Sequence, residues 1–221
     1  RDVLGSRGLG DVYKRQILGD WAMEQPEEHV TTVLKGLKAI SPETNYNFLD
    51  LGWNVRLLSD NQIKEAVQQA RSSDLAILVV GENSMRYHWN EKTCGENSDR
   101  YELSLPGRQQ ELVEAVAATG VPTVVILVNG RPLTTEWIDE NMPCIIEAWE
   151  PGVAGGQALA EILYGKVNPS GKLPITIPRS TGQIQCMYNH KFTNHWFPYA
   201  TGNSLPCLLY TSPSPRDPKT S

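Results

Sequence analysis

The 221-residue sequence has no long apolar run and no excess of positive charge. Its longest apolar stretch covers residues 75–81, far short of the roughly 20 residues that a membrane-spanning helix needs. The 20 lysines and arginines are outnumbered by 25 acidic residues, which gives a formal net charge of −5. Because phosphate binding requires a basic surface, this balance argues against nucleic acid as a partner. The sequence therefore predicts neither a membrane span nor a nucleic-acid-binding surface.

Metal-binding and nucleotide-binding motifs are also missing. The four cysteines lie far apart without a C-x-x-C pair, and the four histidines show no metal-ligand spacing on a helix face. There is no G-x-G-x-x-G after a strand, no G-x-x-x-x-G-K-[ST] and no G-x-S-x-G. These absences disfavour a dinucleotide site, a phosphate loop and a serine hydrolase. We expect no metal and no organic cofactor.

The two ends of the chain differ in composition from the segment between them. Residues 207–221 break abruptly with the composition of the preceding segment and carry three prolines. Residues 1–16 are similarly unlike the segment that begins at residue 17. We interpret residues 1–16 as a non-native leader and residues 207–221 as a non-native, disordered tail. The interpretable domain then covers residues 17–206.

From residue 55 onward, helix-like and strand-like patterns alternate. Ser59 and Gln62 form a capping box ahead of a helix with Ile63, Ala66, Val67 and Ala70 on one face. The apolar runs that predict buried parallel strands cover residues 74–81, 123–128 and 144–149, and the further helices are expected over residues 108–119, 133–140 and 154–164. This alternation predicts an α/β fold, a three-layer sandwich with a mostly parallel β-sheet flanked by helices.

Three loops come after the carboxyl ends of the predicted strands, where open parallel sheets bind their ligands. They cover residues 82–106, 129–132 and 150–156. The first is far longer than the usual βα connection of about two to six residues. It is also rich in aromatic and charged residues, so we expect it to carry the function.

Carboxylates in the long loop are the candidates for catalysis. Glycoside hydrolysis needs one carboxyl group that protonates the leaving oxygen and a second that acts as nucleophile or base. The pattern around Glu102 indicates a solvent-facing side chain, and Glu91 adjoins a lysine as surface charges do. Glu96 comes directly after a glycine, which allows close approach of the backbone. The residues alone leave the choice open among Glu82, Glu91, Glu96, Asp99 and Glu102.

Four segments resemble the second domain of family 3 glycoside hydrolases, in the order and spacing of that family. They are residues 79–116, 125–133 ("VILVNGRPL"), 145–184 and 188–191 ("YNHK"). The resemblance extends over residues 17–206 and is close to bacterial β-glucosidase-like members, particularly those of Bacteroidetes. It implies that the chain is this C-terminal α/β-sandwich domain, truncated at both ends.

The resemblance also implies roles for individual residues. In that family a preceding (β/α)8 barrel carries an aspartate nucleophile, and the second domain supplies the acid/base glutamate. Members often show this glutamate in a G-E-x-x-D-R pattern, which stands here at residues 95–100, so Glu96 is the expected acid/base and Glu91 a distant alternative. Trp21 resembles a tryptophan that contacts the sugar beyond the cleaved bond, although a core position remains equally open. The residues expected to support the loop are Asp99, Arg100 and Arg131.

The implied function is that of a retaining β-glycosidase, most directly a β-glucosidase acting on a β-linked oligosaccharide or an aryl glucoside. Its partner would be the (β/α)8 barrel of the same protein, and we expect the chain without that barrel to be inactive. Family habit implies a periplasmic or secreted location. Two alternatives stay open: a free-standing α/β binding module, and a purely structural lid on a barrel that carries the whole catalytic site.

Overall fold

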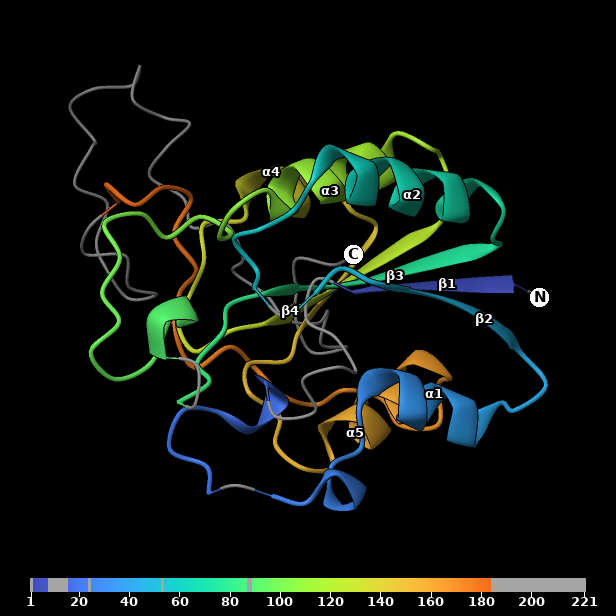
Figure 1. Cartoon of the computed structure of the whole chain (residues 1–221), viewed down its shortest axis with the longest axis horizontal. Coiled ribbons are helices and arrows are strands. Elements are labelled where there is room, and N and C mark those ends of the chain that lie inside the picture. Colours follow the sequence, from blue (N-terminus) through green and yellow to red (C-terminus); the bar gives the residue numbers. More distant parts are fainter. Residues whose placement is uncertain (1, 8–15, 24, 53, 87–88, 184–221) are drawn as a thin grey trace, which may run out of the picture.

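A computed structural model describes residues 2–7, 16–23, 25–52, 54–86 and 89–183. Five strands form one sheet in the order β2-β1-β3-β4-β5, and each described pairing is parallel. The strands are β1 (Asp2–Arg7), β2 (Asn45–Asp50), β3 (Leu75–Gly81), β4 (Thr123–Val128) and β5 (Cys144–Glu147). Figure 1 shows this sheet edge-on between two layers of helices. The expected α/β sandwich with a parallel sheet is confirmed.

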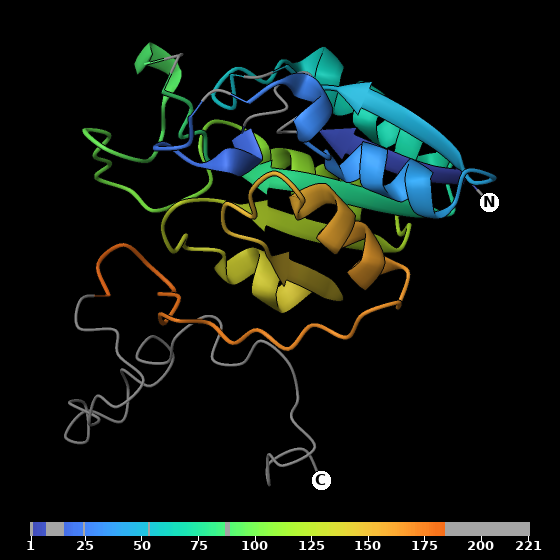
Figure 2. The same cartoon turned by 90° about the horizontal axis from the view of Figure 1, so that it is seen from below.

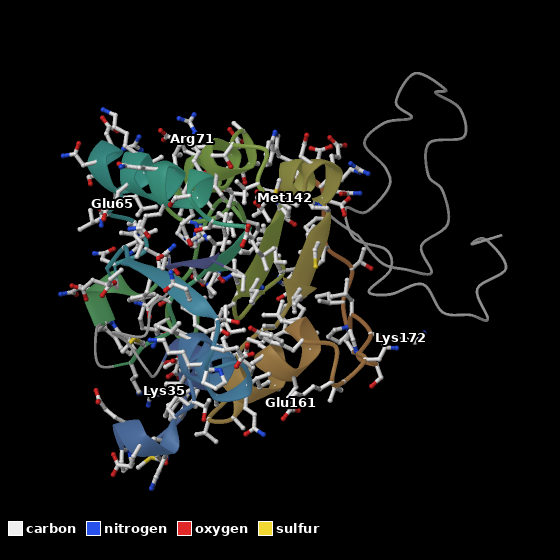
Figure 3. All side chains as sticks on the ribbon, turned by 90° about the vertical axis from the view of Figure 1, so that its right-hand side faces the viewer. Lys35, Glu65, Arg71, Met142, Glu161 and Lys172 are labelled. Carbon is white, nitrogen blue, oxygen red and sulfur yellow. The ribbon has the colours of Figure 1, made fainter. Side chains whose placement is uncertain are left out.

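The helices divide unequally between the two faces of the sheet. Helices α2 (Asp60–Arg71), α3 (Gln109–Ala117) and α4 (Glu136–Asn141) cover one face, and α1 (Val33–Ile40) and α5 (Gly155–Leu163) cover the other (Figure 1). Short 3-10 helices are η2 (Gln16–Leu18), η3 (Glu27–His29) and η4 (Trp89–Glu91). Charged side chains such as Glu65 on α2 and Lys35 on α1 lie on the outer surface (Figure 3).

The core has two parts because the strands alternate their side chains between the faces. On β3, Leu78 and Val80 pack under α2 and α3, whereas Ile77 and Val79 pack towards α1 and α5. Strand β4 is buried on both faces along its whole length. Strands buried on both sides must be apolar throughout, which is the pattern that predicted them.

Helix α2 begins where its local sequence predicts. The Ser59 hydroxyl accepts a hydrogen bond from the Gln62 N–H at 3.3 Å, and the Gln62 side chain accepts one from the Ser59 N–H at 2.9 Å. This capping box satisfies two donors at the start of the helix. Of the predicted core face, Ile63, Ala66 and Ala70 are buried and Val67 is half-buried.

Helices α1 and α5 touch through glycines on the opposite face of the sheet. A Cβ on Gly36 would lie 2.2 Å from the Gly156 carbonyl oxygen, and a Cβ on Gly156 would lie 2.1 Å from the Thr32 carbonyl oxygen. No side chain fits into such gaps. The two backbones therefore pack directly against each other. Figure 2 shows the two helices side by side, α1 in blue and α5 in orange.

The amino-terminal third contains elements that the sequence analysis did not predict. Strand β1 lies inside the segment interpreted as a non-native leader, and it pairs with both β2 and β3. Excluding residues 2–7 from the fold was therefore wrong as a structural expectation, while their non-native origin stays a prediction. Helix α1 and strand β2 come next along the chain. The expected tail at residues 207–221 lies outside the described residues. Within the described ranges, no helix is long and apolar enough to cross a membrane.

Candidate functional site

The strand order places a switch point between β1 and β3. Chain connections leave these two neighbouring strands towards opposite edges of the sheet, because β1 leads to β2 and β3 leads to β4. Crevices at such points, beyond the carboxyl ends of the strands, are the usual ligand sites of open α/β sheets. The segment with Asp20 and Trp21 comes after β1, and the long loop with Glu96 comes after β3.

All three loops selected from the sequence meet at the carboxyl ends of the strands. Arg131, from the loop after β4, donates hydrogen bonds to the carbonyl oxygens of Thr93 at 3.1 Å and Ser98 at 2.7 Å. Glu150, from the loop after β5, lies against Gly19, where a Cβ would come within 2.7 Å of its carboxylate. The Arg131 hydrogen bonds hold the long loop against the loop after β4, and the Glu150 contact holds the loop after β5 against the segment after β1.

A buried carboxylate lies at the base of the long loop. The Glu82 side chain is 0% exposed and contacts Arg100 at 3.1 Å and Arg131 at 3.3 Å. Burial raises the pKa of Glu82, and the two guanidinium groups oppose that rise. Arg100 also donates to the Ser104 carbonyl oxygen at 2.8 Å. One acid thus joins both predicted arginines to the start of the loop.

Gln109 ties the end of β3 to the start of α3. Its side-chain oxygen accepts a hydrogen bond from the Gly81 N–H at 2.9 Å, and its amide donates to the carbonyl oxygens of Gly81 at 2.7 Å and Pro106 at 3.0 Å. The residue is fully buried. It satisfies backbone groups where the strand ladder ends and the functional loop begins.

A second buried ion pair surrounds the main chain of Glu96. Lys92 Nζ lies 2.9 Å from Asp20 Oδ1, and the two side chains are 0% and 8% exposed. Asp20 Oδ2 accepts a hydrogen bond from the Glu96 N–H at 2.6 Å, while Lys92 donates to the Glu96 carbonyl oxygen at 3.0 Å. Burial favours a higher pKa for Asp20, but Lys92, the Glu96 N–H and Arg86 together hold it below its usual range.

The Glu96 carboxylate points to the surface at this end of the sheet. Its side chain is 43% exposed and contacts Arg86 at 3.2 Å. The Arg86 guanidinium in turn lies 3.8 Å from the centre of the Trp21 ring. Trp21 is 70% exposed, so it is not the core tryptophan that the sequence left open. Glu96, Arg86 and Trp21 therefore form one accessible group.

Other exposed aromatic residues lie in the same loop region. Trp89 and Tyr101 are exposed, and Lys92 Nζ lies 4.5 Å from the centre of the Trp89 ring. A cavity of about 480 Å³ occurs elsewhere, between β5, α5 and residues 167–173, and none of Glu96, Arg86 and Trp21 lines it. That cavity is therefore separate from the accessible group of Glu96, Arg86 and Trp21.

The described residues include no group of three or more histidine, cysteine or acidic side chains placed to hold a metal ion. Cys94 is buried beside Glu82 and Glu150, and burial together with these two carboxylates raises the pKa of its thiol. A thiol that resists ionisation is a poor nucleophile. The Cys94 thiol is therefore not a candidate nucleophile at this end of the sheet.

The structure brings most of the predicted site residues together. Glu96 and Trp21 share the accessible group, Arg100 donates to a carbonyl oxygen within the long loop, and Arg131 donates to that loop from the loop after β4. Asp99 is different, because it is exposed and bonds to none of the described residues. Glu91 lies in η4 and is half-buried.

Two important residues were missed by the sequence reasoning, namely Asp20 and Lys92. A lysine in a polar loop resembles a surface charge, and its partner lies 72 residues away in sequence. No local sequence pattern predicts an ion pair between residues so far apart.

The sequence matches the family model of the glycosyl hydrolase family 3 C-terminal domain over residues 3–211. A β-xylosidase of Formosa agariphila is 36% identical over 90% of this chain, and a periplasmic β-glucosidase of Salmonella typhimurium is 40% identical over 68% of it. The chain spans 28% and 21% of the lengths of these two relatives. It is thus comparable to one part of each.

The fold is similar to that of solved β-glucosidases. A β-glucosidase from Listeria innocua in complex with isofagomine superposes with a TM-score of 0.77 at 26% identity, covering 95% of this chain and 29% of that one. A mutant of the same enzyme in complex with laminaribiose gives the same TM-score. Together with the family match over nearly the whole length, the chain belongs to glycosyl hydrolase family 3, as its C-terminal domain.

Proposed function

We propose that this domain supplies the acid/base glutamate of a retaining β-glycosidase, and that Glu96 is that residue. One observation carries the proposal. The Glu96 carboxylate is accessible while its main chain is fixed by buried charges, at the carboxyl ends of the strands and beside an exposed tryptophan. A general acid must be held in place and still reach the substrate.

In this proposal the second carboxylate comes from a (β/α)8 barrel in the part of the relatives that the chain does not span. The barrel aspartate attacks the anomeric carbon while Glu96 protonates the departing oxygen. Glu96 then takes a proton from the water that hydrolyses the glycosyl-enzyme. The two carboxyl groups of a retaining enzyme stand about 5–5.5 Å apart. The exposure of the Glu96 carboxylate and of Trp21 supports such a partner, because both side chains are accessible from outside the described domain.

Trp21 is proposed to stack on the sugar beyond the cleaved bond. Its exposed ring offers an apolar face to a pyranose, and Arg86 covers the ring at 3.8 Å. During protonation of the leaving oxygen, the Glu96 carboxyl group has to face the sugar instead of Arg86. Arg86 therefore moves or exchanges partners when substrate enters.

The proposed substrates are terminal β-linked glucosyl residues in oligosaccharides and aryl glucosides. The support comes from the names of the relatives, which include β-glucosidases from several bacteria as well as β-xylosidases. One relative is named periplasmic, and we propose the same location for the full-length protein. The chain of 221 residues by itself is expected to hydrolyse neither substrate.

The test uses the full-length protein with its barrel and compares wild type with Glu96→Ala. On an alkyl β-glucoside, whose leaving group needs protonation, kcat/KM should fall by about 10²–10⁴-fold. On 2,4-dinitrophenyl β-glucoside kcat/KM should change little, but kcat should fall because hydrolysis of the glycosyl-enzyme lacks its general base. Azide, which needs no base, should restore kcat and give β-glucosyl azide.

The matched control is Glu91→Ala, which removes a half-buried carboxylate from the same loop. This substitution should leave kcat/KM on both substrates unchanged. Unchanged turnover by Glu96→Ala on both substrates would overturn the assignment and favour a structural lid. Loss in Glu91→Ala with azide rescue would move the acid/base role to Glu91.

A further inference from the structure

The buried pair of Asp20 and Lys92 needs an explanation beyond stability. Removing two opposite charges from water is costly, and apolar residues of similar volume often stabilise a protein equally well. Here the ammonium is 0% exposed and the carboxylate 8% exposed. What distinguishes this pair is the set of groups that it bonds.

Each charge binds one of the two main-chain polar groups of Glu96. The Asp20 carboxylate accepts from the Glu96 N–H at 2.6 Å, and the Lys92 ammonium donates to the Glu96 carbonyl oxygen at 3.0 Å. The 2.9 Å contact between the two charges closes the ring. Hydrogen bonds that involve an ionised group are among the strong ones in proteins. The backbone on both sides of the Glu96 side chain is therefore fixed.

The backbone on either side of Glu96 has an uncommon conformation. Gly95 has φ +91° and Asn97 has φ +57°, so Glu96 stands between two residues in the left-handed region. Glycine adopts such a φ freely, and asparagine is one of the few other residues that tolerate it. A Cβ on Gly95 would lie 2.7 Å from Asp20 Oδ2, so the glycine also makes room for the carboxylate.

The same pair joins the two halves of the accessible group. Asp20 is the sequence neighbour of Trp21, whereas Lys92 belongs to the loop of Glu96. The contact therefore holds the segment after β1 against the loop after β3, across the switch point of the sheet. A change in either charge would shift Glu96 relative to Trp21.

We propose that Asp20 and Lys92 are positioning residues that hold the Glu96 carboxyl group in line with the leaving oxygen. The inference rests on the proposed function of Glu96 and deepens it. Neither residue touches the substrate or transfers a proton. Both act by fixing the main chain from which the acid/base side chain projects.

The experiment measures kcat/KM of the full-length protein on an alkyl β-glucoside and on 2,4-dinitrophenyl β-glucoside. The variants are Asp20→Asn, which keeps the shape of the carboxylate, and the neutral double variant Asp20→Asn/Lys92→Met. The double variant leaves no buried charge unpaired, so it keeps the test open if the single one does not fold. The control, Arg179→Gln, breaks the ion pair of Arg179 with Glu136 and Glu140. None of these three residues bonds to Asp20, Lys92 or Glu96 in the described part of the chain.

We expect both variants to lose about 10- to 100-fold in kcat/KM on the alkyl glucoside, because small displacements of a catalytic group have costs of this size. On the dinitrophenyl glucoside, which needs no acid, the loss should stay below about threefold. The control should match wild type on both. A general loss of folded enzyme cannot produce this difference, since it lowers the apparent kcat/KM on both substrates by the same factor.

Equal losses on the two substrates, or no loss on either, would overturn the positioning role while leaving Glu96 as the acid/base. If Glu96→Ala itself shows no dependence on the leaving group, the proposed function fails and the role of the pair fails with it. The two failures are therefore distinguishable from one set of measurements.

Discussion

Ile126 in strand β4 and Glu82 in the loop after strand β3 are both almost fully buried, but different contacts hold them there. Ile126 packs among other aliphatic side chains, where any partner of suitable volume would serve. Glu82 needs two particular guanidinium groups, because a buried charge without partners is very costly. The interior of the sheet thus depends on apolar packing, whereas the carboxyl ends of the strands depend on specific charged pairs.

The largest effect on stability is expected for Glu82→Ala. The substitution leaves Arg100 and Arg131 facing each other without a counter-charge, and breaking a buried pair in this way costs about 3–5 kcal/mol. Urea denaturation measures the free energy of unfolding. Glu111→Gln, which breaks an exposed ion pair with Arg108, should change it by less than about 1 kcal/mol. Similar losses in both variants would erase the distinction between the site and the outer surface.

Gly156→Ala tests packing away from the site, at the backbone contact between α1 and α5. The new methyl group would meet the Thr32 carbonyl oxygen at 2.1 Å, so the helices must separate. Overpacking of this kind costs about 3 kcal/mol. Gly171→Ala, where no atom lies within 4 Å of the added Cβ, is the matched control. A midpoint of thermal unfolding that is equally unchanged in both variants would contradict direct backbone packing.

Glu147→Gln should stabilise the protein at neutral pH. Burial raises the pKa of Glu147 from 4.5 to about 7, although N–H groups of Trp149 and Asn129 oppose the rise. Because the folded pKa exceeds the unfolded one, the stabilising contribution is complete below about pH 4.5 and is lost as the pH rises through about 7. Above pH 7 the free energy of unfolding of the glutamine variant should therefore exceed that of wild type by about 2 kcal/mol. The difference should vanish near pH 4, and a difference independent of pH would contradict the assignment.

Ser59→Ala gives the smallest expected effect. It removes the hydroxyl that caps α2, which costs about 1 kcal/mol. Ser72→Ala at the other end of the helix removes an exposed hydroxyl that donates to the Gln69 carbonyl oxygen at 2.9 Å, and its free energy of unfolding should stay within about 0.5 kcal/mol of wild type. Urea denaturation measures both values, and an equal effect at the two ends would mean that the capping box adds nothing.

The elements after residue 55 could be predicted from the sequence because their signals are local. Strand β4 matched its predicted bounds, since the β-branched and aliphatic residues between Pro122 and Asn129 leave little choice. The capping box at Ser59 likewise lies within four residues. The three loops at the carboxyl ends of the strands could be selected from the parallel order of the strands alone.

The features that could not be predicted depend on contacts between distant residues. Lys92 resembles an ordinary surface lysine until Asp20 is placed beside it. Gln109 stands at the start of a helix, and its role for Gly81 becomes visible only when strand and helix are packed. Strand β1 was missed for another reason, because the unusual composition of residues 1–16 led to their exclusion.

The central claim is tested most directly by a crystal structure of the full-length protein with the sugar trapped on its nucleophile. The measurement is the distance between the Glu96 carboxyl group and the barrel carboxylate. The account predicts about 5–5.5 Å, the separation in retaining enzymes. A separation above roughly 6.5 Å would indicate inversion. A Glu96 side chain still bonded to Arg86 and turned from the sugar would contradict its role as acid/base.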